Sequence, residues 1–185
     1  LELGGNAAFI VFDDADLEAA LEGIHICKFR NSGQTCIAAN RILVQKSIYD
    51  KFVAALSARA QKIQVGHGLE QATQMGPLID ERGLEKVERL VADATDKGAK
   101  IHVGGKRHKA GGTYFQPTVM TGVSTEMDLA HEELFGPVAA ISTFRDEQDA
   151  ISMANDTPYG LAGYFYSRDV GRIFRVADAL EVGIV

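Results

Sequence analysis

One of the two cysteines, Cys36, stands in a context that suits a nucleophile. It ends the segment 31–36, Asn-Ser-Gly-Gln-Thr-Cys, whose small and polar side chains can leave a thiol accessible and favour its thiolate form. Residue type alone also allows a buried structural cysteine. Cys27 falls near the apolar face of a predicted helix, so we assign it to packing. Cys36 is therefore the first candidate for chemistry.

Two glutamates could act beside such a thiol. Glu2 lies between two leucines and before a glycine pair, where it could end a strand and serve as a general base in a cleft. Glu133 could accept hydrogen bonds from a ribose diol, and Phe135 could pack on a flat ring. The alternatives are a solvated glutamate at position 2 and a charged turn before a core aromatic at 133–135.

Arg30 lies six residues before Cys36 and could bind a substrate carboxylate through two hydrogen bonds. A surface arginine at a helix C-terminus is the alternative interpretation. The histidines at 25, 67, 102, 108 and 131 form no recognised metal-binding motif, so we predict no metal.

The elements that must position these residues alternate between extended and helical patterns. Strands are predicted at 7–12, 42–44, 101–103, 138–144 and 163–167, with an extended segment at 114–119 and a last strand from Gly183. Helices are predicted after an N-cap at Asp13 or Asp14, and at 47–63, 80–97, 146–154 and 169–180, with Gly98 as a C-cap. This alternation predicts an α/β fold with three layers, α/β/α, and a largely parallel sheet.

The bulk properties narrow the class of protein. A length of 185 residues suits one domain, and a net charge of -6 argues against nucleic acid as a partner. There is no apolar run long enough for a bilayer, so we expect no membrane association. Two cysteines without C-x-x-C spacing favour a reducing cytoplasm. Because the chain starts at Leu1 and stops in a predicted strand, we expect it to be part of a larger protein.

Five short segments, taken in order, resemble the aldehyde dehydrogenase superfamily over the whole chain. They are Leu-Glu-Leu-Gly-Gly at 1–5, Gly-Gln-Thr-Cys at 33–36, Gly-Pro-Leu-Ile at 76–79, Glu-Glu-Leu-Phe-Gly-Pro at 132–137, and Asn-Asp-Thr-Pro-Tyr-Gly-Leu-Ala at 155–162. Each segment alone is weak, and the ordered set is specific. The resemblance implies that 1–185 is the catalytic domain, without the cofactor-binding Rossmann-like half and a C-terminal segment.

The resemblance also implies roles for individual residues. Cys36 would be the catalytic thiol, and Glu2 the base that activates water for deacylation. Glu133 would bind the hydroxyls of the nicotinamide ribose, with Phe135 beside the nicotinamide. Lys86 would lie at the adenosine end of NAD or NADP.

The sequence Lys-Phe-Arg-Asn at 28–31 resembles the succinate-semialdehyde dehydrogenase branch of this family, in which the arginine binds the far carboxylate. This implies oxidation of succinate semialdehyde to succinate, with glutarate semialdehyde as the alternative substrate. The position two residues after Cys36 is Ala38, so no redox-switch disulfide is expected there. The full-length protein is expected to be a homo-oligomer, either a dimer or a tetramer.

Two other readings of the chain remain open. A thiol hydrolase would need a histidine partner for Cys36, and no histidine falls in a recognisable motif. Alternatively, the 185 residues are catalytically silent by themselves. We expect no aldehyde oxidation by this chain alone, because the cofactor-binding half is missing.

Overall fold

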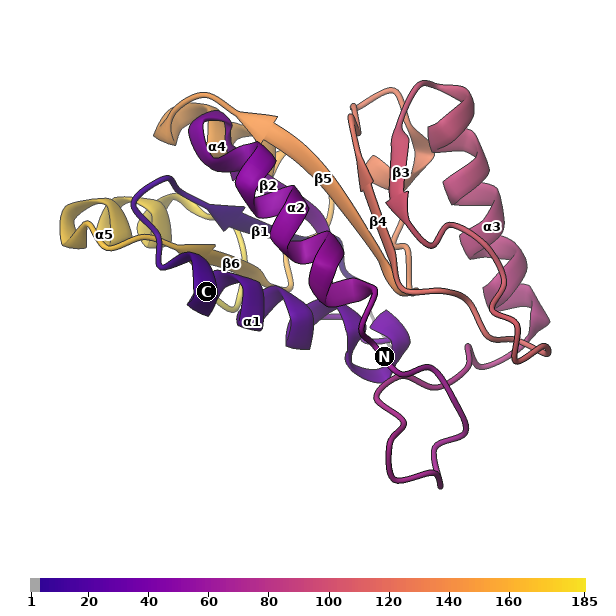
Figure 1. Cartoon of the computed structure of the whole chain (residues 1–185). Helices are drawn as coiled ribbons and strands as arrows, with labels where there is room; N and C mark the ends of the chain where they lie inside the picture. Colours follow the sequence, from indigo (N-terminus) through magenta and orange to yellow (C-terminus); the bar gives the residue numbers. More distant parts are fainter. Residues whose placement is uncertain (1–3) are drawn as a thin grey trace.

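A single six-stranded sheet organises the chain, with the strand order β3-β4-β5-β2-β1-β6 (Figure 1). The computed structural model describes residues 4–185, so the predicted base Glu2 lies outside the described residues. Neighbouring strands are parallel except for the antiparallel pair β3 and β4, which confirms the prediction of a largely parallel sheet. The strands are β1 Ala7–Val11, β2 Ala39–Gln45, β3 Lys100–Val103, β4 Thr118–Thr121, β5 Val138–Phe144 and β6 Gly163–Tyr166.

Helices cover both faces of this sheet, as predicted for three layers. On one face lie α1 and α2, and their apolar residues share one core with β1, β2 and β5. On the other face, α4 and α5 pack against β1 and β2, while α3 packs against β4 and β5. The helices are α1 Leu17–Phe29, α2 Tyr49–Ala60, α3 Glu81–Asp96, α4 Glu147–Asn155 and α5 Val170–Ala179.

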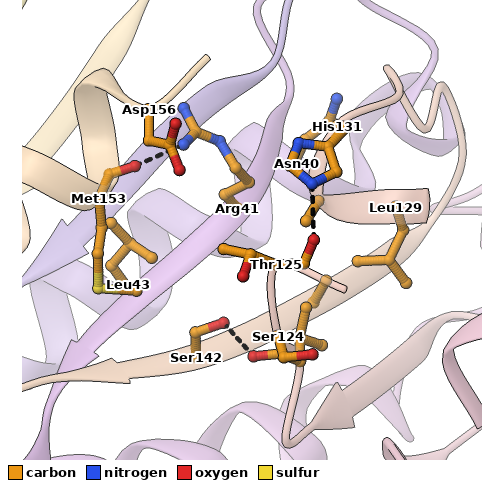
Figure 2. A pocket seen from close by; sticks show the side chains of 13 residues that line it. Asn40, Arg41, Leu43, Ser124, Thr125, Leu129, His131, Ser142, Met153 and Asp156 are labelled. Carbon is orange, nitrogen blue, oxygen red and sulfur yellow. Dashed lines mark hydrogen bonds between the residues drawn. The ribbon is translucent and has the colours of Figure 1, made fainter. Parts of the chain in front are cut away.

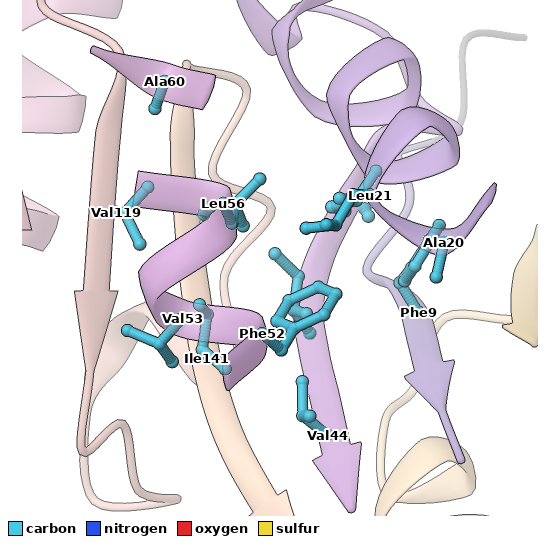
Figure 3. Close-up of a cluster of buried hydrophobic side chains, with 14 of the residues drawn as sticks. Phe9, Ala20, Leu21, Val44, Phe52, Val53, Leu56, Ala60, Val119 and Ile141 are labelled. Carbon is cyan, nitrogen blue, oxygen red and sulfur yellow. The ribbon is translucent and has the colours of Figure 1, made fainter. Parts of the chain in front are cut away.

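Strand β1 shows why the sequence predicts a buried strand. Phe9 and Val11 belong to the core under α1 and α2, whereas Ala8 and Ile10 belong to the core under α4 and α5. Because side chains alternate between the two faces of a strand, a strand covered on both faces is apolar throughout. Figure 3 shows Phe9 near α1, with Phe52 and other α2 side chains in the same core.

Three local predictions need correction. The N-cap of α1 is Asp16, whose side chain accepts a hydrogen bond from the Ala19 N–H, and not Asp13 or Asp14. Of the extended segment predicted at 114–119, only the last two residues belong to a strand, because β4 begins at Thr118 and continues to Thr121. The helix predicted over 47–63 is shorter, since a 3-10 turn at Lys46–Ile48 precedes α2 and the helix ends at Ala60.

Two other predictions are close to the observed elements. The strand predicted at 138–144 has those bounds as β5. Gly98 has a φ of 100° and follows Lys97, the C-cap of α3, so it terminates this helix in the left-handed region as expected. Over residues 4–185, no helix is both long and apolar enough to cross a membrane.

Candidate active site

The segment that leads to Cys36 leaves α1 through an unusual turn. Residues Arg30–Gly33 form a 3-10 turn in which Asn31, Ser32 and Gly33 all have positive φ, at 51°, 57° and 73°. Serine rarely adopts this conformation, and such strain persists only where surrounding contacts enforce it. The turn reverses the chain from α1 toward the start of β2, and partly exposed Cys36 lies just before that strand.

Contacts from the segment 76–79 hold this turn in place. The Ser32 hydroxyl donates to the Gly76 carbonyl at 2.8 Å. The Gln34 side chain accepts from the Ile79 N–H at 2.8 Å and donates to the Pro77 carbonyl at 3.3 Å. The segment Gly-Pro-Leu-Ile therefore supports the loop that carries the thiol, although the hydrogen-bonded residues are 43 to 45 positions apart in the sequence.

Two further hydrogen bonds fix the chain on either side of Cys36. The Ala38 N–H donates to the Thr35 carbonyl at 3.0 Å, which closes a tight turn around the cysteine. The Tyr164 hydroxyl, from β6, donates to the Ile37 carbonyl at 2.8 Å. The thiol-bearing loop is thus attached to the sheet as well as to segment 76–79.

Glycines allow three segments to meet at this site. A Cβ atom on Gly5 would lie 2.0 Å from the Cys36 carbonyl oxygen, and one on Gly33 would lie 2.2 Å from the Gly136 carbonyl oxygen. Both separations are far shorter than any van der Waals contact. The segments before β1, before β2 and before β5 can therefore pack together only with glycine at these positions.

These contacts bring four predicted residues into one cleft of about 360 Å³. Its lining includes Cys36, Lys86 from α3, Glu133 and Phe135. One Glu133 carboxylate oxygen accepts the Gly5 N–H at 2.9 Å. Phe135 is 36% exposed and has a φ of 51°, so its ring is presented by a strained backbone. The roles of these residues remain predictions, and their proximity is a property of the fold.

Arg30 is the exception among the candidates within residues 4–185. It is exposed and lines a neighbouring cavity of about 290 Å³, together with Cys27, Thr35 and Tyr164. Thr35, the residue before Cys36, also borders this cavity. Arg30 therefore lies beside the thiol-bearing loop, in a cavity whose lining does not include Cys36.

Cys27 contrasts with Cys36. It packs against the core and its thiol donates a long hydrogen bond of 3.7 Å to the Ile37 carbonyl. Burial raises the pKa of the Cys27 thiol, which disfavours a thiolate at neutral pH. Its assignment to packing agrees with this environment.

One buried cation, Lys28, and one partly buried cation, Arg41, were not among the site residues predicted from the sequence. Lys28 is completely buried, and burial lowers its pKa to about 7. Arg41, in β2, donates to the carbonyls of Asn6, Met153 and Ala154 at 2.7–3.1 Å. Lys28 lies one helical turn after Ile24, on the buried face of α1, and that spacing was the available signal.

Figure 2 shows the surroundings of Arg41, where a separate cavity of about 90 Å³ lies between β2 and the segment 123–131. Its lining, which includes Arg41 and Asp156, contains none of the predicted site residues. The Asn6 carbonyl bound by Arg41 lies directly after the glycine pair. Arg41 therefore anchors the segment that packs on Cys36.

No group of three or more His, Cys, Asp or Glu side chains that could hold a metal ion is found within the described range 4–185.

Comparison with known proteins agrees with this arrangement. The model of the aldehyde dehydrogenase family matches residues 1–185. A succinate-semialdehyde dehydrogenase (NADP(+)) of Escherichia coli K12 is 54% identical over 185 residues, which are 100% of this chain and 38% of that protein. A glutarate-semialdehyde dehydrogenase of Pseudomonas aeruginosa is also 54% identical, with the same coverage.

A solved structure shows the same fold. Betaine aldehyde dehydrogenase from Staphylococcus aureus, in complex with NAD+, superposes with a TM-score of 0.97 and 46% identity, over 100% of this chain and 38% of that one. The chain thus spans 38% of the length of the two enzymes that it matches in sequence. With the family model covering every residue and the thiol, glutamate and phenylalanine in one cleft, this chain belongs to the aldehyde dehydrogenase family.

Proposed function

We propose that the full-length protein oxidises an aldehyde that carries a carboxylate, with succinate semialdehyde as the first choice and NAD or NADP as hydride acceptor. The observation that carries this proposal is the cleft in which Cys36 and Glu133 lie together, although 97 positions separate them in the sequence. The similarity to a succinate-semialdehyde dehydrogenase supports the choice of substrate.

The residues of the cleft fit a dinucleotide. Glu133 has one oxygen occupied by the Gly5 N–H, and a Cβ atom at Gly4 would lie 2.9 Å from the other oxygen. Glycine at position 4 therefore keeps that oxygen accessible to ribose hydroxyls. Phe135 is exposed enough to contact a flat ring, and Lys86 supplies a positive charge on the α3 side of the cleft.

The chemistry of the chain would centre on Cys36. Its thiolate attacks the aldehyde carbon and forms a thiohemiacetal, whose oxyanion we expect the Cys36 backbone N–H to stabilise. Glu133 and Phe135 would hold a nicotinamide, which would supply the hydride acceptor for the oxidation, and Cys36 would then carry the acyl group as a thioester. Water then releases the carboxylic acid, with Glu2 as the expected base. This sequence of steps uses covalent catalysis to separate oxidation from hydrolysis.

The first experiment tests the nucleophile. We expect Cys36→Ser in the full-length protein to lower kcat for succinate semialdehyde by about 10³-fold or more, because an alcohol is a much weaker nucleophile without an activating base. Cys27→Ser should leave kcat within about twofold. A fully active Cys36→Ser variant would exclude the proposed chemistry.

The second experiment tests the substrate class. Loss of a bidentate arginine contact should weaken binding by about 1.5–3 kcal/mol, so Arg30→Ala should raise KM for succinate semialdehyde about 10- to 150-fold. KM for propanal, which has no carboxylate, should change less than about twofold. Arg145→Ala, at an exposed arginine after β5, is the matched control. Equal increases for both aldehydes would contradict the carboxylate role of Arg30.

A specific observation keeps glutarate semialdehyde as the second candidate, since a glutarate-semialdehyde dehydrogenase has the same identity to this chain. Comparing kcat/KM for the two semialdehydes with the wild-type full-length enzyme would decide between them.

We also propose that the full-length protein is a cytoplasmic homo-oligomer, and that residues 1–185 alone are inactive. Aldehyde-dependent NAD(P)H formation by the isolated chain would refute the last point.

A further inference from the structure

Lys28 is a buried cation for which the proposed chemistry has no use. It lies on α1, eight residues before Cys36, and its side chain is completely buried. Fully buried lysines are rare, because removing an ammonium group from water is costly unless partners compensate. Its Nζ donates to Asn40 Oδ1 at 3.4 Å. A methionine would fill similar space without that cost, so the ammonium calls for a functional explanation.

The contact between Lys28 and Asn40 fixes which way the Asn40 amide points. In its ammonium form, Lys28 can only donate hydrogen bonds, so Asn40 turns its oxygen toward it. The amide nitrogen then points to the other side, where it donates to the Gly5 carbonyl at 3.2 Å. A flipped amide would place its oxygen against that carbonyl, and two acceptors would repel each other. Lys28 therefore selects the one orientation of Asn40 that binds Gly5.

Gly5 is the next member of this series of contacts. Its carbonyl accepts from Asn40, and its N–H donates to Glu133 Oε1 at 2.9 Å. Its α-carbon lies so close to the Cys36 carbonyl that a Cβ atom there would be 2.0 Å away. The Gly5 residue thus touches both the thiol-bearing loop and the glutamate of the cleft, and Asn40 holds it from the core side.

We propose that Lys28 is a positioning residue for the reaction, because it orients Asn40, which sets the Gly5 backbone against Cys36 and Glu133. This inference rests on the proposed function only for its activity readout. The titratable groups that act on Lys28 electrostatically are Cys27, on the same helix, and Glu133, in the loop before β5. Cys27 acts only as a thiolate, which its raised pKa disfavours at neutral pH, so Glu133 is the group that favours the charged form of Lys28 there.

The test uses Lys28→Met in the full-length enzyme. Because methionine removes a buried charge without removing much volume, we expect an unchanged or higher melting temperature. We expect kcat to fall at least tenfold, KM for the aldehyde to change less than twofold, and the rate of Cys36 alkylation by iodoacetamide to differ at least threefold from wild type. Ile24→Val is the matched control, since it lies fully buried one turn earlier on the same helix. It should lower the melting temperature with little effect on kcat or alkylation.

A double-mutant cycle separates this role from a general packing role. If Lys28 acts through Asn40, then Lys28→Met combined with Asn40→Ala should lower kcat no further than the more damaging single variant. Wild-type kcat and alkylation in Lys28→Met, or additive losses in the double variant, would overturn the proposal. Should the wild-type enzyme oxidise no aldehyde, the proposed function fails, and the alkylation rates of the same variants still decide the role of Lys28.

Discussion

The contact between Gly5 and the Cys36 carbonyl leads to a sharp prediction about Gly5→Ala. A Cβ atom there would lie 2.0 Å from the carbonyl oxygen, whereas ordinary contact begins near 3.4 Å. Either backbone must therefore shift by more than about 1 Å, and neither atom belongs to a flexible side chain. Overpacking of this kind destabilises by about 1–3 kcal/mol. A displacement of about 1 Å at reacting groups lowers the rate by about 10²-fold.

The assay compares single-turnover NAD(P)H formation and chemical denaturation for wild type, Gly5→Ala and Gly68→Ala in the full-length enzyme. Gly68 is a suitable control because a Cβ atom there meets nothing within 4 Å. We expect Gly5→Ala to lose about 10²-fold in rate together with about 1–3 kcal/mol of stability, while Gly68→Ala stays close to wild type. A Gly5→Ala enzyme with the wild-type rate would refute the argument that this contact positions the thiol.

Three other predictions concern stability. Lys28→Met should stabilise the protein most at or below pH 7, and this gain should shrink toward pH 10.5. The wild-type protein bears the cost of a buried ammonium group at low pH. That cost is relieved between pH 7 and 10.5, because folded Lys28, with its pKa of about 7, is neutral there while the unfolded chain still binds the proton. Burial raises the pKa of Asp14, but hydrogen bonds from Ser167 and from backbone N–H groups outweigh burial, and the pKa is lowered. Asp14→Asn should therefore destabilise the folded protein at pH 7, and progressively less as the pH falls below about 4. Urea denaturation across pH measures both, and a pH-independent difference would contradict either one. Tyr164→Phe removes the hydrogen bond to the Ile37 carbonyl and should cost about 0.5–1.5 kcal/mol in the same assay, and an unchanged midpoint would show that this bond adds nothing.

Much of the fold could be predicted because its signals are local. The segment 138–144 became β5 with the same bounds, since its first four residues are apolar and buried, as is typical of a strand covered on both faces. The start of α1 was harder. Asp13, Asp14 and Asp16 all suit an N-cap, and Asp14 is instead occupied by Ser167 and the backbone of 168–169, which lie far away in sequence.

The residues of the candidate site could be predicted from the sequence, but the contacts that hold them together could not. Residue types and their order pointed to Cys36, Glu133 and Phe135, and the fold brings these three into one cleft. The sequence could not reveal that the two glycines near the N-terminal end of the chain pack on Cys36 and Glu133, because that contact depends on three separate segments. The helical spacing of Lys28 after Ile24 was a signal for its burial, but its partner Asn40 could not be foreseen, because Asn40 belongs to another element.

The cleft lies at the amino-terminal ends of β1, β2 and β5, so the candidate chemistry is separated from a group of stabilising ion pairs at the other ends of the strands. The carboxyl-terminal ends of these strands carry ion pairs, such as Asp14 with Arg172 at 2.7 Å and Glu147 with Arg175. Those contacts join loops and helices that do not touch the thiol. Protein engineers could therefore strengthen the contacts around Asp14 and leave the chemistry intact, whereas a Cβ atom added at Gly5 or Gly33 would collide with the backbone of the site.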